Sequence, residues 1–596
     1  MKSSYENPLA PVVPGDGTVD SCADPTVLRG QQYGDDYWYM YCTTDPLNDD
    51  DRDDQGELRF REIPTMRSLD LVNWEYLGEA VTEPPGWAAE GAALWAPDVV
   101  YSNSFDRYYL FVTVTDTDAS ISGVDGCTSD SAIGVATSDG PTGPWTFSDV
   151  PVVAPRSAGE ECDFFWTYDP DVLGDSVGTQ STLYYGSYFG GIFASTLTLT
   201  GTGATASTAD ETRVTIGNRY EGPNVVRRGD HYYLFVSATN CCNGALTGYS
   251  VFAGRSTDPR GPFDREGNSL LAPRVGGTPV ISMNGNRWVG TGHNSVFQDA
   301  SVRWWTAYHA VDQQDPFFEG SPGFTKRPVL LDPVDWVDGW PTVRGGLWAS
   351  DSRIPAPAAQ TGQRSRYRTE LVEPLVPGKR IHRASDELRG NAIDDDWTWV
   401  REPDSDSYDV GGGLLSWQTQ GADLFEDDNT ASVLTRPAPS GDYVVETRVR
   451  LDVPLEGEFN FAQGGLVVYG GDDEYVKLVS ASIWETRQTE FAKEVDTAPE
   501  GSPRYGNTVV GPPDEWTHLR IVVERLNGRE RREAGGDTER YTAFTSQDGR
   551  RWLRGGSWTH HLGDADIGLV SMGYSGVPAD FDYVRVSRLE QGRHHH

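Results

Sequence analysis

The chain has 596 residues, more than one ordinary domain holds, and its 37% of hydrophobic residues is enough to fill two or three cores. Its 89 acidic and 49 basic residues give a net charge of −40, which opposes binding to nucleic acid and to anionic membranes. The sequence contains no apolar run of membrane-spanning length, so we expect neither nucleic acid nor a membrane as a partner.

Five similar phrases follow one another along the first half of the chain. Each begins with a polar head residue, continues as a short apolar stretch, and leads to a strand rich in aromatic residues. The heads are roughly 50 to 75 residues apart, which suits the four-stranded sheet that forms one blade of a β-propeller. The five head residues are Asp24, Asp98, Asp169, Glu221 and His293. We therefore predict an all-β chain with a five-bladed propeller over residues 1–350, whose head residues meet at one end of the axis.

The composition changes after the last phrase. Residues 351–388 are rich in Pro, Ala, Gln, Arg and Ser without a repeat, and we interpret them as a linker that crosses the propeller surface. Residues 389–591 contain short alternating segments separated by turn signals, which predicts a β-sandwich. Residues 592–596 end in three histidines and resemble the remnant of a tag.

The cysteines suggest the compartment in which the protein works. The sequence has six of them, grouped as Cys22 with Cys42, Cys127 with Cys162, and Cys241 beside Cys242. No Cys-x-x-Cys is present, which argues against a zinc site. The first two groups are candidate disulfides, whereas we interpret the adjacent cysteines as a local packing feature. Disulfides favour an extracellular protein, and we expect that a leader has been removed before the Met-Lys-Ser-Ser start.

Three carboxylates at one end of the propeller point to the hydrolysis of a glycosidic bond. That reaction needs an acid for the leaving oxygen and a base or nucleophile on the opposite face of the sugar. Asp24 and Glu221 come from non-adjacent blades and can face each other, while Asp169 can keep Glu221 protonated by its negative charge. Arg327 is a candidate to bind a hydroxyl group or to tune the base. Flat faces for sugar rings are expected from Trp95, Phe165, Trp166, Phe189 and Tyr220, and Asp98 is expected to line the same site.

Each of these residues also has an ordinary structural explanation. Asp-Pro commonly opens a turn, which would account for Asp24 and Asp169. Glu221 before Gly-Pro could hydrogen-bond a neighbouring backbone group, and His293 could be a core histidine. The aromatic strands fill the space between blades in any propeller, and Arg327 could pair with a surface carboxylate. The recurrence of the polar residues in one repeat favours the functional interpretation.

Six phrases in this order resemble glycoside hydrolase family 43 over residues 20–350. They are Ala23-Asp24-Pro25, Trp95-Ala96-Pro97-Asp98, Tyr168-Asp169-Pro170, Tyr220-Glu221-Gly222-Pro223, Gly292-His293-Asn294 and Asp338-Gly339-Trp340-Pro341. The resemblance implies an inverting mechanism with Asp24 as general base, Glu221 as general acid and Asp169 as the residue that positions Glu221 and modulates its pKa. It gives Asp98 a mouth-lining or structural role, and it implies a calcium ion at the propeller axis, held by water and His293. The C-terminal region is similar to the concanavalin-like (jelly-roll) sandwiches appended to some members.

Other phrases resemble the arabinanase and arabinofuranosidase branch, namely Asn240-Cys241-Cys242, Gly276-Gly277-Thr278-Pro279 and Gly285-Asn286-Arg287-Trp288-Val289-Gly290. The resemblance implies hydrolysis of α-L-arabinofuranosidic bonds, with exo action on arabinan or on arabinose side chains, so the expected partner is an oligo- or polysaccharide. A β-xylosidase and a β-D-galactofuranosidase are the alternatives on the same scaffold. The oligomeric state stays open, as does the choice between salt adaptation and coding bias for the acidic composition.

Two further classes remain as rivals. A related five-bladed class cleaves fructosides with retention, but it would show Arg-Asp-Pro and Glu-Cys where this chain has Tyr-Asp-Pro and Glu-Gly-Pro. A non-catalytic carbohydrate-binding propeller is the second rival, and it has no need of three carboxylates at one mouth.

Overall fold

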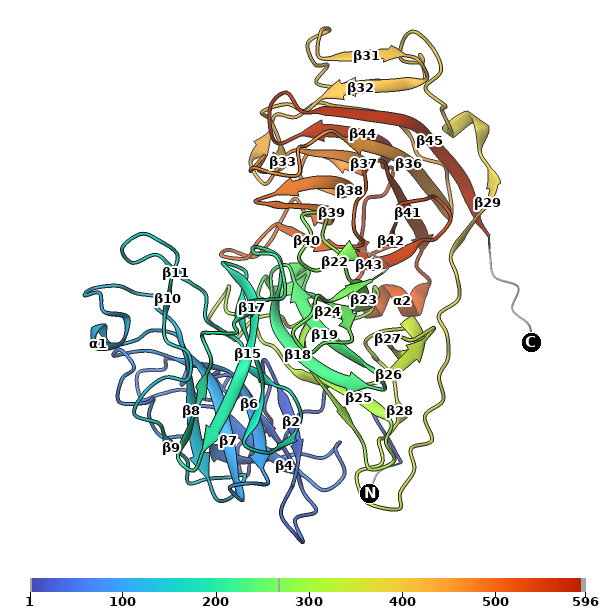
Figure 1. Ribbon diagram of the computed structural model, residues 1–596. Coiled ribbons are helices and arrows are strands. Elements are labelled where there is room, and N and C mark those ends of the chain that lie inside the picture. Colours follow the sequence, from blue (N-terminus) through green and yellow to red (C-terminus); the bar gives the residue numbers. More distant parts are fainter. Residues whose placement is uncertain (1–2, 266–267, 591–596) are drawn as a thin grey trace.

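The computed structural model describes residues 3–265 and 268–590, and nearly all of its regular structure is β-strand (Figure 1). Five consecutive sheets form a five-bladed propeller, and two larger sheets form a sandwich packed against it. The fold class expected from the sequence is therefore confirmed. The expected tag at residues 592–596 lies outside the described residues. Among the described helices, none has the length and apolarity needed to cross a membrane.

The blades follow one another along the chain as antiparallel sheets. Their innermost strands are β2 (Thr26–Arg29), β6 (Leu94–Ser102), β12 (Asp171–Val172), β18 (Glu221–Arg228) and β24 (Trp288–Gln298). The second strands are β3 (Trp38–Tyr41), β7 (Arg107–Val114), β14 (Gln180–Ser187), β19 (His231–Ala238) and β25 (Trp304–Asp312). The third strands are β4 (Pro64–Ser68), β8 (Ala132–Ser138), β15 (Gly191–Thr200), β20 (Ser250–Ser256) and β26 (Val329–Val337). Each innermost strand contacts the next, and β24 contacts β2, so the ring closes around one axis.

The aromatic second strands fill the space between blades. Successive side chains of a strand point to opposite faces of its sheet. Tyr108 therefore packs toward blade 1 and Tyr109 toward blade 3, and Tyr184 and Tyr185 divide in the same way between blades 4 and 2. Both faces of a blade are covered by its neighbours, which explains why these strands read as unbroken apolar runs. Five separate hydrophobic clusters result, one between each pair of adjacent blades.

The outer strands complete the blades. Four of them are β5 (Glu75–Glu79), β9 (Thr146–Phe147), β16 (Gly203–Ala206) and β27 (Trp340–Val343). Blade 4 ends instead in the short strands β21 (Asp264–Arg265) and β22 (Asn268–Ser269) and adds β23 (Thr278–Ile281) beside β20. Two loops contribute further short strands, β13 (Ser176–Val177) parallel to β6 and β17 (Thr212–Arg213) beside β15.

The C-terminal sandwich has two antiparallel sheets around a large apolar core. One sheet has the order β31 (Tyr408–Gly411), β32 (Leu414–Gln418), β45 (Pro578–Glu590), β36 (Tyr443–Leu451), β41 (Thr517–Arg525), β42 (Glu539–Ser546) and β43 (Leu553–His560). The other has the order β30 (Thr398–Val400), β35 (Val433–Pro437), β44 (Asp566–Met572), β37 (Gln463–Gly471), β38 (Glu474–Ile483), β39 (Thr486–Glu494) and β40 (Tyr505–Val509).

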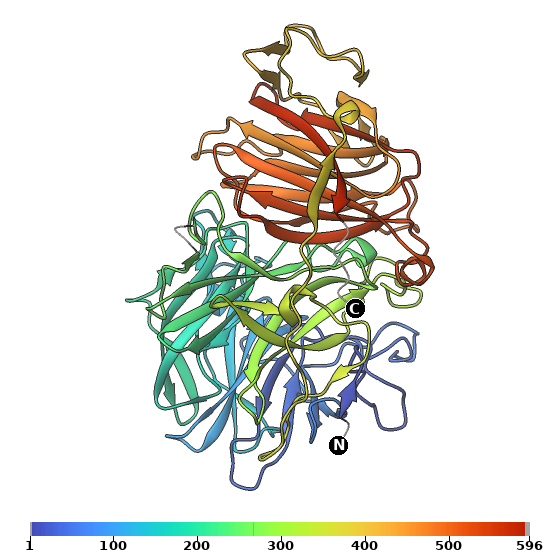
Figure 2. The same ribbon diagram turned by 90° about the vertical axis from the view of Figure 1, so that its right-hand side faces the viewer.

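The sandwich packs on the fourth and fifth blades, as the two views in Figures 1 and 2 show. Ser250 in blade 4 hydrogen-bonds Thr508 in β40 at 3.0 Å, and Arg219 donates to Gln488 in β39 at 2.7 Å. The segment expected as a linker joins both units by short strands. Its β28 (Ile354–Pro355) pairs with β1 (Ser4–Tyr5) at the N-terminus, and its β29 (Val376–Arg380) pairs with β45.

All six cysteines form disulfides. Cys22 pairs with Cys42 and Cys127 pairs with Cys162, as the sequence suggested. Cys241 and Cys242 are also bonded to each other, so their interpretation as a mere packing feature is wrong.

Candidate active site

The backbone at the start of each innermost strand shows which residues occupy equivalent positions in the five blades. One residue there has a left-handed conformation, which non-glycine residues rarely adopt outside functional or over-constrained sites. These residues are Asp24 (φ 50°), Ala96 (φ 47°), Asp169 (φ 55°), Gly222 (φ 56°) and His293 (φ 45°). The registers expected for the second and fourth blades are therefore wrong. Asp98 lies two residues beyond the true head of its blade, and Glu221 lies one residue before the head.

Polar side chains of the preceding blade hold the heads in place. Each comes from the last few residues of a second strand or from just beyond it, so the same contact recurs around the axis. Backbone amides donate from Ala96 to Thr43 at 2.8 Å, from Asp169 to Thr113 at 2.9 Å, from His293 to Ser237 at 2.8 Å and from Asp24 to His309 at 3.2 Å. In the fourth blade the hydroxyl of Ser187 donates instead to the Glu221 carboxyl at 2.9 Å.

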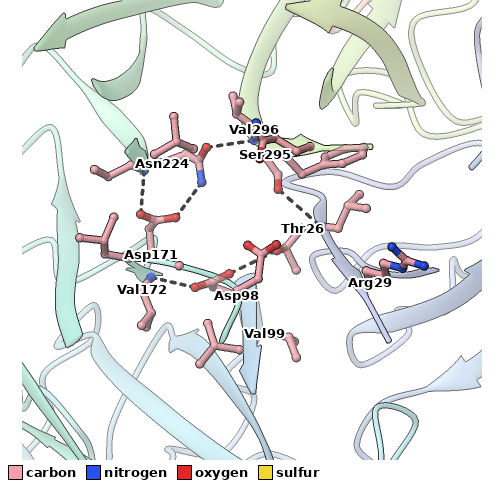
Figure 3. Close-up of a pocket in the computed structure, with 18 of the residues that line it drawn as sticks. Thr26, Arg29, Asp98, Val99, Asp171, Val172, Asn224, Ser295 and Val296 are labelled. Carbon is pink, nitrogen blue, oxygen red and sulfur yellow. Dashed lines mark hydrogen bonds between the residues drawn. The ribbon is translucent and has the colours of Figure 1, made fainter. Parts of the chain in front are cut away.

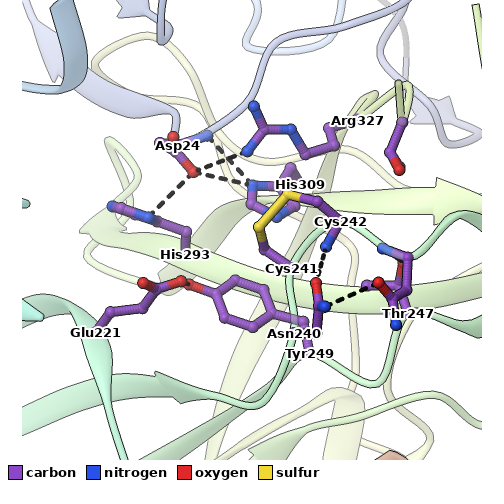
Figure 4. Close-up of a disulfide and its surroundings, with 12 residues drawn as sticks. Asp24, Glu221, Asn240, Cys241, Cys242, Thr247, Tyr249, His293, His309 and Arg327 are labelled. Atoms are coloured by element: carbon purple, nitrogen blue, oxygen red, sulfur yellow. Dashed lines mark hydrogen bonds and ion pairs between the residues drawn. A yellow bond between two sulfur atoms is a disulfide. The ribbon is translucent and has the colours of Figure 1, made fainter. Parts of the chain in front are cut away.

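Asp24 is held as an anion. Thr43 donates a hydrogen bond to Oδ2 at 2.6 Å, while Nδ1 of His293 lies 3.0 Å and Nη1 of Arg327 3.7 Å from Oδ1 (Figure 4). Burial alone would raise the pKa of Asp24, but the positive charges of His293 and Arg327 and the hydrogen bond from His293 hold it well below its usual range. A carboxylate in this state can accept a proton from water at neutral pH.

Glu221 is in the opposite state. Burial, reinforced by the negative charge of Asp169, raises the pKa of Glu221 to about 7. Tyr249 donates a hydrogen bond to its Oε1 at 2.7 Å, and Ser187 donates to its Oε2. The two donors fix the direction of the carboxyl group, and its raised pKa lets it hold a proton that it can give to a leaving group.

Asp169 is joined to Glu221 through the backbone. Its Oδ2 accepts a hydrogen bond from the amide of Gly222 at 2.9 Å, so the residue that follows Glu221 is tied directly to this carboxylate. Burial and the negative charge of Asp24 raise the pKa of Asp169 to about 6, although His293 opposes the shift. Asp169 can therefore position Glu221 and also bias its protonation.

The two histidines of the site carry different charges. Burial would lower the pKa of His293, but Asp24 and Asp169 outweigh burial and raise it to about 9. His309 is fully buried, and burial lowers its pKa to about 4. Its Nδ1 accepts the backbone hydrogen bond of Asp24, which requires a neutral ring. A Cβ at Gly222 would come within 3.1 Å of the His293 ring, so glycine there makes room for the charged histidine beside Glu221.

Aromatic side chains line the mouth on the side of blades 2 and 3. Trp95 is 39% exposed and Trp166 is 36% exposed, and the rings of both contact Tyr168. Phe165 in β11 (Phe164–Phe165) and Phe189 are partly buried and pack together at 5.3 Å between ring centroids.

Two residues expected to bind substrate have other positions. Tyr220 is fully buried and donates to the carbonyl of Gly276, so it offers no face to a sugar. Asp98 faces the axial channel, a cavity of about 730 Å³ (Figure 3). Both of its carboxylate oxygens accept hydrogen bonds, one from Thr26 in blade 1 and one from the amide of Val172 in blade 3.

The contacts of Asp98 belong to a closed ring of hydrogen bonds around the channel. Asp171 accepts from Asn224 at 2.8 Å and from the amide of Val225 at 2.9 Å. Asn224 in turn accepts from the amide of Val296 at 3.0 Å. Ser295 closes the ring by accepting from the amide of Val27 in blade 1 at 3.4 Å. These residues tie all five blades together below the catalytic mouth and leave Asp98 a structural role.

Arg327 reaches the site from blade 5. Its guanidinium lies between Asp24 and Asp45, with Nη2 3.4 Å from Oδ2 of Asp45. This position suits a role in keeping Asp24 ionised. Of the two roles expected for Arg327, this position favours the one that tunes the base, Asp24.

His293 offers one nitrogen to a metal ion at most. Nδ1 faces Asp24, and the other ring nitrogen points away from it in Figure 4. Within residues 3–265 and 268–590 there is no group of three or more His, Cys, Asp or Glu side chains placed to hold a metal. A calcium ion beside His293 would thus need water for most of its ligands, since Ca²⁺ takes six to eight oxygens. The calcium site stays a prediction.

Several site residues were missed in the sequence. They are Thr43, Ser187, Tyr249 and His309, which contact Asp24 or Glu221 directly. Thr43, Ser187 and His309 all lie near the end of a second strand, so the signal was a polar residue that ends an aromatic run. Tyr249 precedes a third strand and has no counterpart in the repeat.

Comparisons with known proteins show which families the two units match. The family model "Glycosyl hydrolases family 43" matches residues 10–341, and the model "Beta xylosidase C-terminal Concanavalin A-like domain" matches residues 385–587. The extracellular endo-α-(1→5)-L-arabinanase 1 of Bacillus subtilis (strain 168) is 28% identical over 293 residues, 47% of this chain and 80% of that protein. The extracellular exo-α-(1→5)-L-arabinofuranosidase ArbA of Cellvibrio japonicus (strain Ueda107) is 27% identical over 300 residues, with the same shares. A solved structure of xylan β-1,4-xylosidase from Bacillus halodurans C-125 aligns over 98% of this chain and 100% of its own, with 17% identity and a TM-score of 0.40.

Proposed function

The chain belongs to glycosyl hydrolase family 43, and on that premise we propose that it is an inverting hydrolase of α-L-arabinofuranosidic bonds. The observation that carries the proposal is the opposite protonation of two carboxyl groups in one site. The pKa of Asp24 is held well below its usual range, and that of Glu221 is raised to about 7. Hydrolysis of a glycosidic bond requires this pair of states, an ionised carboxylate and a protonated acid on opposite faces of the sugar, and we take inversion from the family resemblance.

The proposed reaction is a single displacement. Asp24 takes a proton from a water molecule as the water oxygen attacks the anomeric carbon, and Glu221 gives its proton to the leaving oxygen as the glycosidic bond breaks. The released sugar has the inverted configuration. At this point Asp24 is protonated and Glu221 is ionised. Proton exchange with solvent then restores both groups. Asp169 supports the step by holding the backbone beside Glu221 and by raising its pKa.

The arabinose specificity is drawn from the relatives, whose names include arabinanases and an arabinofuranosidase. For this chain we propose exo action. The tip of the β38–β39 hairpin of the sandwich reaches Asn218, three residues before Glu221, and Glu485 accepts a hydrogen bond from Asn218 at 2.8 Å. This contact brings the sandwich close to Glu221, and we propose that it narrows the approach on the fourth-blade side, which would favour a chain end over a continuous chain.

A β-xylosidase is the second candidate. It is favoured by one observation, the match of residues 385–587 to a domain model described from β-xylosidases. The contacts of the sandwich with blades 4 and 5 would be the same in an arabinofuranosidase and in a β-xylosidase. The presence of this domain therefore does not determine which sugar is cleaved.

A panel of substrates tests the proposal. We would measure hydrolysis of nitrophenyl α-L-arabinofuranoside, β-D-xylopyranoside and β-D-galactofuranoside, with linear arabinan alongside and with calcium or a chelator added. The proposal expects the arabinofuranoside to be cleaved fastest and arabinan to release single arabinose units from the start. A preference for the xyloside would establish the second candidate, and a lack of activity on every glycoside would defeat both.

We also propose that the protein works outside the cell. Three disulfides persist best in an oxidising compartment. The two relatives named above are described as extracellular.

A further inference from the structure

The disulfide between Cys241 and Cys242 differs from the other two in the length of chain that it encloses. The other two close loops across 20 and 35 residues, whereas this one joins neighbours in the sequence. The stabilisation that a disulfide gives by restricting the unfolded chain grows with the length of the closed loop. A bond between adjacent residues gains little in this way, so its presence calls for a local role.

The disulfide lies at the catalytic mouth. Its loop follows β19, whose residue Ser237 pairs with Glu221 in the sheet and holds the backbone of His293. Figure 4 draws the disulfide with Tyr249, His309 and Arg327 among its surroundings, and Asp24 and Glu221 fall within the same close-up. Both cysteines are only partly buried.

The loop is braced from several directions. The amide of Cys242 donates to Asn240 at 2.7 Å, and Asn240 donates to Asn243 at 2.8 Å. Asn243 is held by Thr247 at 2.9 Å, and a Cβ at Gly244 would lie only 2.2 Å from the ring of Phe317. These contacts fix the sulfur atoms relative to Glu221 before any substrate arrives, as a binding surface requires.

The aromatic residues on the two sides of the mouth differ in how far they are exposed. Blades 2 and 3 expose the rings of Trp95 and Trp166. On the side of blades 4 and 5, Tyr220, Tyr249 and His309 are fully buried and present no open face. Ligand pockets usually combine apolar surface with a few polar groups, and divalent sulfur is a soft, polarisable contact for C–H groups. The partly exposed disulfide can supply such a surface where these three buried residues do not.

We propose that the Cys241–Cys242 disulfide is a sugar-contacting surface of the active site, which packs against the C–H face of the bound sugar opposite Trp166 and determines how tightly that sugar is held. This inference rests on the proposed function, because it assigns the disulfide to the same substrate. The sulfur atoms take no part in proton transfer. They act on binding, so their loss should affect KM rather than kcat.

The double substitution Cys241→Ser/Cys242→Ser tests the proposal, with Cys127→Ser/Cys162→Ser as the matched control. For the sugar that the wild-type protein cleaves fastest, we expect KM to rise about tenfold in the first variant, as for the loss of an apolar contact in a pocket. We expect kcat to change less than threefold and the pH profile to keep its shape. The control should keep the wild-type KM. A KM within twofold of wild type in a folded Cys241/Cys242 variant would overturn the proposal.

A second measurement uses the wild-type protein and does not depend on the folding of a variant. The rate at which a phosphine reduces each disulfide can be followed by alkylation and peptide mass spectrometry, with and without saturating monosaccharide product. We expect the sugar to slow reduction of Cys241–Cys242 severalfold and to leave Cys127–Cys162 unaffected. Equal slowing, or none, would contradict the inference while wild-type activity keeps the proposed function intact. Absence of wild-type activity on any glycoside would defeat both.

Discussion

Nδ1 of His293 lies 3.0 Å from Oδ1 of Asp24, and this contact joins the head of the last blade to the head of the first. Asp24 helps to raise the pKa of His293 to about 9, so the ring is a cation at neutral pH and faces an anion. The closure of the propeller and the charge of the proposed base thus depend on the same pair.

Replacing His293 with Gln should move the acid side of the pH profile. The positive charge of His293 lowers the pKa of Asp24, so its removal raises that pKa and activity is lost at a higher pH than in the wild type. We expect a displacement of about one to three pH units, the usual effect of an opposite charge at this distance. The profile of kcat/KM, taken from well below pH 4 up to pH 8, measures it. His231→Gln, at the end of β19 far from Ser237, serves as the control, and an unmoved acid side would refute the role of His293.

Replacing Asp169 with Asn should move the alkaline side in the other direction. Glu221 must be protonated to act, and its pKa of about 7 depends partly on the negative charge of Asp169. Without that charge the pKa of Glu221 falls, so activity declines at a lower pH than in the wild type. Asp139→Asn is the control, because it removes a carboxylate whose side chain is 86% exposed and pairs with Arg107, outside the site. Its alkaline side should remain near pH 7, and a shift as large as that of Asp169→Asn would show a nonspecific effect.

Replacing Glu221 with Gln should cost more with a poor leaving group than with a good one. The amide cannot donate the proton, and the loss of a general acid costs about 10²–10⁴ in rate. Nitrophenolate leaves without much help, so its glycoside should lose less activity than arabinan does. Asp24→Asn should slow both substrates to a similar extent, since the attacking water needs its base in each case. Equal losses for the two substrates in the Glu221 variant would argue against its role as the acid.

Replacing Asn224 with Ala should destabilise the propeller. Asn224 donates to Asp171 and accepts from the amide of Val296, so its loss leaves two buried groups without partners in the ring. Each such group costs about 1–3 kcal/mol. The midpoint of thermal unfolding, followed by calorimetry, should fall by several degrees. Asn103→Ala removes an exposed side-chain hydrogen bond and should leave the midpoint unchanged. A stable Asn224 variant would show that the blades are held together by their apolar contacts alone.

The fold was predictable because all five blades must meet the same structural requirement. Five inner strands around one axis need the same local conformation, and the sequence repeats it with the same residue types. Asp24 and Asp169 were recognisable for this reason. The register of Asp98 was wrong because the acidic residues were aligned with one another. The prolines were the better guide, since Pro25, Pro97 and Pro170 each follow the residue with the left-handed backbone.

Contacts made between blades were beyond prediction. Tyr249 precedes a third strand, outside the repeated phrase, whereas His309 lies in the second strand of the last phrase. The roles of both depend on how adjacent blades stack. The burial of Tyr220 has the same origin, because its ring faces the neighbouring blade cluster and not the mouth. A repeat in the sequence predicts the strands of each blade. How deeply a side chain is buried depends on the neighbouring blade.

The stereochemistry of the first product tests the central claim most directly. Proton NMR in the first minutes of hydrolysis, before the released sugar equilibrates, identifies the anomer that the protein forms. With Asp24 as base and Glu221 as acid, an α-L-arabinofuranoside should give β-L-arabinofuranose first. If α-L-arabinofuranose appears first, one of the carboxylates acts as a nucleophile, and the assignment of Asp24 as a base is wrong.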